Sequence, residues 1–527
     1  MDSRKYFALS FAFGIIFAFL YNFQVVNHAP GGWFFPMVYI CTLCTLVLYG
    51  LGLFAFTRGL IPLFFMLAAV ASYFVYIFNY VISGDSAGII AETSFFEAKE
   101  FVDYRLTVWI VLSFCISILF LRLTKKRIPH KNNALVLFLI AFVVVTVCQV
   151  SRLDAVKDRF QKECSSIEGR HITPFSCFDA LAEYIKAQYR IKQRGPLKNS
   201  GDIKASLMEG SPEVIVLIVG ESARADHFSC DGYKRKTSPH IDAEPGLTFF
   251  TNTSSFAATT RQSVPIMITD ATSDNKVVSS SSILDVFNAQ GYSTHWLSLN
   301  DRYNKNNNPT TRIIENVKDK RFRSFFGVKY KTSKDHMLLP AINETVKDSN
   351  TPCFIAVHTR GSHWKYQYRY TKEFERWKPA VADVTDAQRT INAYDNSILM
   401  TDDFIYRVIN LIREKNAILV YCSDHGESLG EDGVFNHGNA KRPEQRHVPF
   451  LVWLSPKYRK LHPQTAKMLT LHSDMPISQD YIFYSLISLG CVKRQGHRYD
   501  LDLTSPKMIA GHGSFGVSKA VAQTMKQ

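Results

Sequence analysis

The first 152 residues contain long stretches without charged side chains. Each stretch approaches the roughly 20 residues that cross a hydrocarbon core about 30 Å thick. The five stretches that lack Asp, Glu, Lys and Arg are Tyr6–Phe23, Trp33–Phe56, Leu60–Ile82, Leu106–Leu121 and Ala134–Val150. We therefore expect five membrane spans. Ionisable residues inside spans would indicate a transport path, so their absence argues against a transporter.

The sequence also lacks internal repeats and low-complexity tracts, which excludes a repeat array. Its 527 residues exceed what one simple core accommodates. We expect three parts: a five-span transmembrane domain at residues 1–152, an amphipathic membrane-interface linker at 153–211 and a catalytic domain at 212–527. Apolar residues recur at helical spacing between Phe175 and Tyr189, and this helix could lie in the membrane interface or pack on the soluble domain.

Basic residues outnumber acidic ones in three of the segments that flank the spans. These segments hold Arg4, Lys5, Arg58, Arg122, Lys125, Lys126, Arg127 and Lys131. The positive-inside rule places such segments in the cytoplasm, so we expect a cytoplasmic N-terminus and, after five crossings, a catalytic domain on the other side. The first span lacks a small-residue cleavage site, which indicates a retained anchor.

Cysteine is sparse outside the spans. Cys164 and Cys177 flank a short polar loop, and in an oxidising compartment they are expected to form a disulfide. The formal net charge of +15 does not indicate nucleic-acid binding. Many of the basic residues belong to the cytoplasmic loops or lie next to the bilayer, where anionic phospholipid attracts them.

Three apolar runs end in residues that bind metals. Val214–Glu221 ends in a carboxylate, Phe354–Val357 leads into a segment ending at His363, and Ala417–Tyr421 leads into Asp424 and His425. Such runs alternate with helix-compatible segments, which predicts an α/β domain with a mainly parallel sheet. Parallel sheets bind ligands at the carboxyl ends of their strands, and this donor set favours Zn²⁺.

A hydroxyl nucleophile is expected near the start of a helix, where backbone N–H groups favour a phosphate. The segment Thr248–Pro265 has a strand-like start, then small and hydroxyl residues, then the helix-compatible stretch Arg261–Asp270. This order places Thr259 or Thr260 at the turn. The alternative is that the Thr pair serves only as an N-cap.

Four motifs carry a family resemblance. They are GESARADHFS from Gly220, TRQSVP from Thr260, HTRGSH from His358, and SDHGESLGE from Ser423 followed by His437-Gly438. In this order and behind five spans, they resemble the inner-membrane phosphoethanolamine transferases, which have an alkaline-phosphatase/sulfatase-like periplasmic domain. The resemblance implies a multi-pass protein of the bacterial inner membrane.

The resemblance also implies residue roles. Thr260 matches the nucleophile that takes phosphoethanolamine from phosphatidylethanolamine as a covalent phosphothreonine and releases diacylglycerol. Glu221, Asp424 and His425, together with Thr260, match the metal site that holds zinc. The positions that match residues binding the phosphate or a second zinc are His363 and His437, with Glu427 assisting.

Departures from the pattern bear on the acceptor. A cysteine pair brackets the nucleophile segment in the lipid A enzymes, but Phe256 and Ile266 occupy those positions here, so packing should hold Thr260. In its length and in the sequence of its nucleophile motif, the chain resembles the branch that modifies osmoregulated periplasmic glucans. The alternative acceptor is lipid A or the lipopolysaccharide core. A phosphoglycerol transferase is a further alternative. A sulfatase activity is disfavoured because Met267 stands where its nucleophile motif has Arg.

Overall fold

The computed structural model describes residues 3–27, 34–78, 82–93, 98, 99, 101–125, 172–193, 203–275, 282–301, 308–327, 329, 333–348 and 351–515. The chain divides into two compact units. The first comprises residues 1–93 and 98–189, and the second comprises residues 94–97 and 190–527. The first unit is helical and the second contains all of the described strands.

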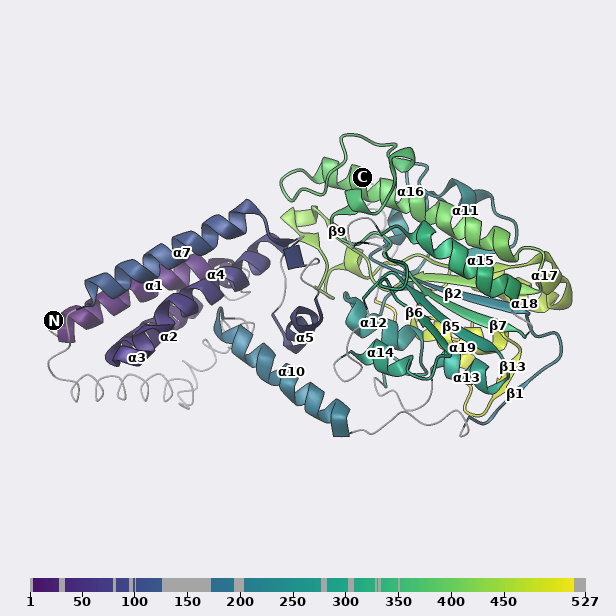
Figure 1. Ribbon diagram of the computed structural model, residues 1–527, viewed down its shortest axis with the longest axis horizontal. Coiled ribbons are helices and arrows are strands. Elements are labelled where there is room, and N and C mark those ends of the chain that lie inside the picture. The colour runs from purple at the N-terminus through teal and green to yellow at the C-terminus, as the bar shows by residue number, and fades with distance from the viewer. Residues whose placement is uncertain are drawn as a thin grey trace. The chain divides into compact units, whose positions relative to one another are not determined.

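The described helices of the first unit are α1 (Ser3–Asn27), α2 (Phe34–Leu53), α3 (Ala55–Arg58), α4 (Leu60–Phe78), α5 (Gly84–Glu92), α7 (Tyr104–Leu123) and α10 (Phe175–Gln193). Helices α1 and α2 pack against each other, as do α4 and α7 (Figure 1). Polar groups on these helices pair with one another: Tyr21 donates to Ser113 Oγ at 2.6 Å, and Trp109 Nε1 donates to Ser72 Oγ at 3.1 Å. Such pairing removes unsatisfied polar groups from an apolar environment.

Three of the five predicted spans form helices of spanning length and composition among the described residues, namely Arg4–Phe23, Ala55–Phe78 and Tyr104–Leu123. The second predicted span forms α2, whose apolar segment Met37–Leu53 is shorter. The fifth, Ala134–Val150, lies outside the described residues, and so does Cys164 of the predicted disulfide. Among the described residues, three helices are therefore long and apolar enough to span a membrane, whereas five spans are predicted for the whole sequence.

The helix predicted between Phe175 and Tyr189 is confirmed as α10. Its beginning is tied to the membrane unit, because Asn22 accepts from Thr173 N at 2.7 Å and the Phe64 and Phe175 rings lie 5.9 Å apart. Further along, four large apolar side chains are half or more exposed: Phe178, Leu181, Ile185 and Tyr189. Most of the predicted linker 153–211 on either side of this helix lies outside the described residues.

The second unit is built on a seven-stranded sheet in the order β3-β11-β8-β2-β7-β5-β6. These strands are β2 (Val214–Gly220), β3 (Leu247–Phe250), β5 (Ser293–Ser298), β6 (Asp319–Arg321), β7 (Cys353–His358), β8 (Ala417–Ser423) and β11 (Phe450–Leu454). Strands β2, β7 and β8 are buried along their whole length, which explains their continuous apolar sequence.

Helices cover both faces of this sheet, with α11, α15 and α16 on one side and α12, α13, α14 and α19 on the other (Figure 1). Their bounds are α11 (Pro239–Ala243), α12 (Thr260–Met267), α13 (Ile283–Ala289), α14 (Pro309–Ile313), α15 (Leu339–Asp348), α16 (Ala387–Ile412), α17 (Pro456–Leu461), α18 (Pro463–His472) and α19 (Asp480–Leu489). Short two-stranded sheets pair β1 (Ala205–Leu207) with β13 (Val492–Arg494), β4 (Thr253–Ser254) with β12 (Ile477–Ser478), and β9 (Ser428–Leu429) with β10 (Phe435–Asn436).

The sheet is mixed, which corrects the prediction of a mainly parallel sheet. Strands β8, β2, β7, β5 and β6 run parallel, but β11 runs antiparallel to both of its neighbours, β8 and β3. The apolar sequence of β11 does not differ from that of a parallel strand, because both are buried on two faces. Strand direction depends on how the connecting loop returns, which the apolar pattern does not encode.

Candidate active site

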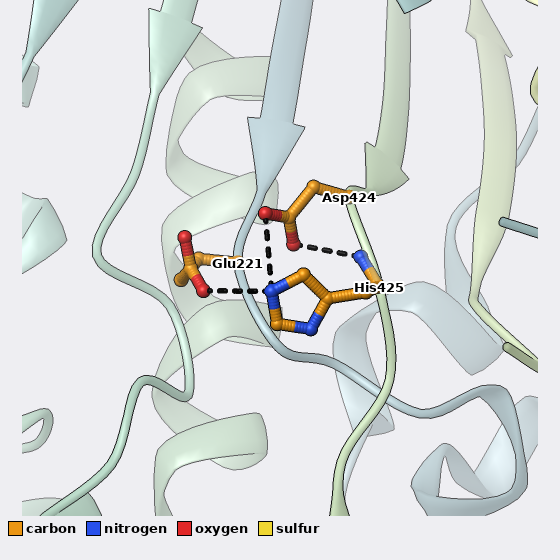
Figure 2. A group of neighbouring side chains, drawn as sticks. All are labelled: Glu221, Asp424 and His425. Carbon is orange, nitrogen blue, oxygen red and sulfur yellow. Dashed lines mark hydrogen bonds and ion pairs between the residues drawn. The ribbon is translucent and has the colours of Figure 1, made fainter. Parts of the chain in front are cut away.

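The register of the central strands brings their ends to one edge. Gly220 at the end of β2 lies opposite Ser423 at the end of β8, and Val219 lies opposite His358 at the end of β7. The next residues after β2 and β8 are Glu221 and Asp424, so the sheet itself sets these two carboxylates side by side. Together with His425 they form a buried group whose ligand atoms all lie within 4.8 Å of one another (Figure 2).

The imidazole of His425 faces both carboxylates. Its Nε2 lies 3.5 Å from Glu221 Oε1 and 3.5 Å from Asp424 Oδ2 (Figure 2). Its Nδ1 lies 2.9 Å from the Gly426 carbonyl oxygen, which only accepts hydrogen bonds. The proton therefore belongs on Nδ1, which leaves the Nε2 lone pair directed at the carboxylates, as metal-binding histidines require.

The charges of this group call for a cation. Burial and the neighbouring Glu221 carboxylate raise the pKa of Asp424 to about 7. Burial alone would also raise the pKa of Glu221, but His425, His363 and the Ser222 hydroxyl more than offset it, and the pKa of Glu221 is lowered. Asp424 Oδ2 is buried without a hydrogen-bond partner. An orphaned carboxylate oxygen beside an imidazole lone pair fits a divalent metal.

The nucleophile segment meets this group through Thr260, the first residue of α12. Thr260 Oγ1 lies 3.1 Å from Glu221 Oε2 and 3.4 Å from His425 Nε2. Thr259 is the N-cap residue, but its side chain makes no capping hydrogen bond and its hydroxyl is buried without a partner. The structure thus brings Thr260 to the predicted metal ligands, at the start of a helix, where the helix dipole favours a phosphate.

The remaining predicted residues form a second cluster beside the first, which we call the histidine cluster: His363, His437 and Glu427. His437 Nδ1 lies 3.3 Å from Glu427 Oε2, and the rings of His437 and His363 are 6.3 Å apart. The His437 ring lies 4.1 Å from that of His425, which links the two clusters. Burial and the Glu221 charge raise the pKa of Glu427, whereas burial and the two other histidines lower that of His437.

Two residues that the sequence analysis did not single out position the metal-type group, by which we mean Glu221, Asp424 and His425. Ser222 has φ 56°, its hydroxyl donates to Glu221 Oε1 at 2.7 Å, and its N–H donates to Asp424 Oδ1 at 3.1 Å. Gly361 has φ +41°, and a Cβ there would lie 2.5 Å from the Glu221 carbonyl oxygen. Both lie within the quoted motifs, but only their backbone angles and close contacts reveal the role.

Comparisons with known proteins agree with this geometry. The family pattern described as Sulfatase matches residues 213–490, which is more than half of the chain, and that described as Phosphoethanolamine transferase EptA/EptB matches residues 40–189. A Kdo(2)-lipid A phosphoethanolamine 7''-transferase of Salmonella typhimurium is 26% identical over 471 residues, covering 82% of each chain. Phosphoethanolamine transferase EptA of Escherichia coli K12 is 28% identical over 470 residues, covering 83% of each.

Solved structures share the fold. The integral membrane lipooligosaccharide phosphoethanolamine transferase A of Neisseria meningitidis has a TM-score of 0.77 at 21% identity and covers 94% of this chain and 98% of its own. The periplasmic domain of EptC from Escherichia coli, in complex with Zn, has a TM-score of 0.53 at 23% identity, covering 61% of this chain and 95% of its own. The predicted combination of a membrane domain with an alkaline-phosphatase-like domain is thereby confirmed.

The expected branch is not supported. The Salmonella typhimurium relative is named for Kdo(2)-lipid A, and none of these relatives is named for a periplasmic glucan. The substitution of two cysteines by Phe256 and Ile266 was therefore a weak guide to the acceptor. The chain belongs to the sulfatase family and, within it, to the phosphoethanolamine transferases, and it is an enzyme.

Proposed function

We propose that the protein transfers phosphoethanolamine from phosphatidylethanolamine, through a phosphothreonine at Thr260, to lipid A or the lipopolysaccharide core. The observation that carries this proposal is the Thr260 hydroxyl 3.1 Å from Glu221, at a helix start beside a buried group of metal-type ligands. A hydroxyl in that setting is suited to attack a phosphodiester. The relative named for Kdo(2)-lipid A, 82% of whose length is matched, supports this choice of acceptor.

Zn²⁺ is the ion that we propose for Glu221, Asp424, His425 and Thr260. One imidazole nitrogen with carboxylate and hydroxyl oxygens is a donor set that zinc accepts in four-coordinate sites. When bound, zinc would polarise a phosphoryl oxygen and lower the pKa of the threonine hydroxyl. The Zn complex of the EptC periplasmic domain, which shares the fold, is consistent with this choice.

The chain's own residues hold the proton and the nucleophile. Thr260 Oγ1 donates its hydrogen bond to Glu221 Oε2, which keeps an oxygen lone pair free for the incoming phosphorus. In the first half-reaction a bond forms between Oγ1 and phosphorus and the bond to the diacylglycerol oxygen breaks; Thr260 gives its proton to Glu221, and the departing diacylglycerol oxygen takes up one proton. In the second, an acceptor oxygen attacks the same phosphorus and Thr260 Oγ1 departs and regains a proton.

We assign the phosphate and the departing or entering group to the histidine cluster. The His437 ring lies 4.1 Å from that of His425 and 6.3 Å from that of His363, so a phosphoryl group held at His425 would lie within reach of this cluster. Neutral imidazoles can donate one hydrogen bond and accept another, which suits proton transfer to an alkoxide. Glu427 orients His437 through the 3.3 Å contact to Nδ1.

We further propose a bacterial inner-membrane location with a cytoplasmic N-terminus and a periplasmic catalytic unit. Arg58 donates to the Thr124 carbonyl oxygen at 3.0 Å and to the Leu121 carbonyl oxygen at 3.1 Å, so the ends of α3 and α7 lie on the same side. That contact supports one cytoplasmic face for these two basic segments. A phosphatase reporter fused after Arg152 should be active and one fused at Lys126 inactive; an active Lys126 fusion contradicts this topology.

The linker 153–211 is proposed to lie in the membrane interface through α10. The exposed side chains of Phe178, Leu181, Ile185 and Tyr189 form an apolar face on a helix anchored to the membrane unit. The variant Ile185→Trp, reconstituted in vesicles, should be quenched by lipids brominated near the headgroup. Fluorescence that brominated lipid leaves unchanged would place this face against protein instead.

The acceptor is tested by mass spectrometry of lipopolysaccharide and periplasmic glucans from cells with and without the gene. We expect phosphoethanolamine to disappear from lipid A or core when the gene is deleted and to return with wild-type protein but not with Thr260→Ala. Loss from glucans with lipopolysaccharide unchanged would overturn the acceptor while leaving the donor chemistry intact. Labelled phosphatidylglycerol serving as donor in place of phosphatidylethanolamine would overturn the donor.

A further inference from the structure

Hydrogen bonds hold the backbone of the segment that leads to Thr260 at three successive residues. Strand β4 (Thr253–Ser254) pairs with β12 (Ile477–Ser478), and then Ser255 N donates to the Arg446 carbonyl oxygen at 2.7 Å. Ala257 N donates to Ser263 Oγ at 3.2 Å, which closes the segment onto α12. Between these two contacts Phe256 N donates to the side chain of Gln479 at 2.8 Å.

The amide of Gln479 reaches the metal-type group at its other end. Its Nε2 donates to the carbonyl oxygens of Ser423 and Asp424, each at 2.8 Å, while its Oε1 accepts from Phe256 N. Gln479 is fully buried. Both amide hydrogens and one oxygen lone pair are therefore used, and the side chain spans directly from the nucleophile segment to the end of β8.

Strand pairing makes this connection only indirectly, through the isolated bridge between Ser254 and His447, which precedes β11. Strand β8 pairs with β2 and β11, whereas β4 pairs with β12, so the nucleophile segment and the Asp424 strand belong to different sheets. Gln479 follows β12 directly and precedes α19, which places it at the junction of the two sheets. If the Gln479 side chain moved away, Phe256 N and the carbonyl oxygens of Ser423 and Asp424 would each lose a hydrogen bond, which costs free energy in a buried site. The Gln479 side chain therefore favours one distance between the nucleophile segment and the end of β8.

We propose that Gln479 is a positioning residue that sets the distance from Thr260 to Asp424 and His425 for the donor half-reaction. The inference rests on the proposed function, because it assumes that Thr260 attacks the donor phosphorus. Gln479 lies behind the backbone of both segments and acts through them. A displacement on the order of 1 Å between nucleophile and metal ligands is expected to cost about a hundredfold in rate.

The test compares two buried amides at opposite ends of β8. Asn416 Nδ2 donates to the carbonyl oxygens of Gly210 and Ser211, at 3.3 and 3.0 Å, so it makes the same kind of double contact far from Thr260. Gln479→Met and the control Asn416→Leu each remove such contacts with little change in volume. Diacylglycerol release from phosphatidylethanolamine is measured on the zinc-saturated full-length protein, together with zinc content and melting temperature.

We expect both variants to have a lower melting temperature than the wild type. Only Gln479→Met is expected to have a lower kcat, by tenfold or more, while its KM for the lipid stays within twofold of the wild-type value. An unchanged kcat, or an equal loss in Asn416→Leu, overturns the inference. If Gln479→Met does not fold, the shorter amide in Gln479→Asn, which cannot span both partners, should show the kcat loss, and a wild-type kcat there also overturns it. Full activity in Thr260→Ala would instead overturn the proposed function.

Discussion

The two clusters of the site are built in different ways. Glu221 and Asp424 follow seven-residue strands that pair along their whole length, so the sheet fixes their separation. His437 and Glu427 flank the two-residue strands β9 and β10, and His363 lies in the loop after β7. The first cluster is therefore part of the sheet, whereas the histidine cluster depends on loops and their anchors.

This difference fits different roles for the two clusters. Groups that must keep metal geometry within a few tenths of an ångström belong on rigid strands, and groups that meet a variable acceptor belong on loops. Loss of a sheet-borne residue should abolish chemistry, and loss of a loop-borne residue should reduce it.

Thr260→Ala is expected to lower transfer by at least about a thousandfold, because it removes the group that becomes covalently modified. The protein should remain folded and bind zinc, measured by circular dichroism and metal analysis. Thr259→Ala is the matched control, since its hydroxyl contacts no partner and its loss should cost little. A dead Thr259→Ala beside an active Thr260→Ala would move the nucleophile by one residue.

His425→Ala is expected to lose the tightly held zinc and, with it, activity, because the imidazole nitrogen is the single nitrogen donor of the sheet-borne group. Metal analysis of the purified full-length protein measures this directly. His447→Ala is the control, because His447 Nε2 instead lies 3.0 Å from the Thr251 carbonyl oxygen. Chelator-treated, metal-free protein that still releases diacylglycerol would falsify the zinc requirement.

His437→Gln should lower the rate by roughly a hundredfold, the usual scale for one proton-transfer or phosphate-binding group, and leave the first zinc in place. Steady-state kinetics with parallel metal analysis check both statements. If the variant loses the tightly held zinc as well, the two clusters act as one metal site and the comparison fails.

The smallest effect is expected for the ion pair between Arg224 and Asp226. Arg224 anchors the loop that carries Glu427 of the histidine cluster. Arg224 Nη1 donates to the Glu427 carbonyl oxygen at 3.1 Å, and its Nη2 pairs with Asp226 Oδ2 at 2.7 Å. Burial alone would raise the pKa of Asp226, but the guanidinium outweighs it and the pKa lies well below its usual value. The stabilisation is thus complete above a pH of about 4 and is lost as the pH falls toward the depressed pKa.

Asp226→Asn should accordingly cost about 2 kcal/mol of unfolding free energy at pH 7, the scale of a hydrogen bond to a charged group. The difference from wild type should shrink as the pH falls below 4. Denaturant unfolding at pH 7 and pH 3 measures it. A difference that stays constant across this range would show that the ion pair contributes nothing to stability.

The sequence by itself determined the segments that carry the chemistry. A fully apolar run such as Val214–Val219 has one stable place, the middle of a sheet, and the residue after it must then lie at the sheet's edge. The helix between Phe175 and Tyr189 was likewise predictable from its periodicity and is confirmed as α10. These features depend on local pattern and burial, which residues a few positions apart reveal.

Only the tertiary structure decided how those segments meet. Strand β11 reverses direction, Ser222 and Gly361 adopt left-handed angles, and Gln479 contacts Phe256, from which it is 223 residues away in the chain. Packing was expected to hold Thr260, and hydrogen bonds of the neighbouring backbone, including the one to Gln479, add to it. Long-range register and side-chain bridges depend on the free energy of the whole assembled domain, and no local pattern records them.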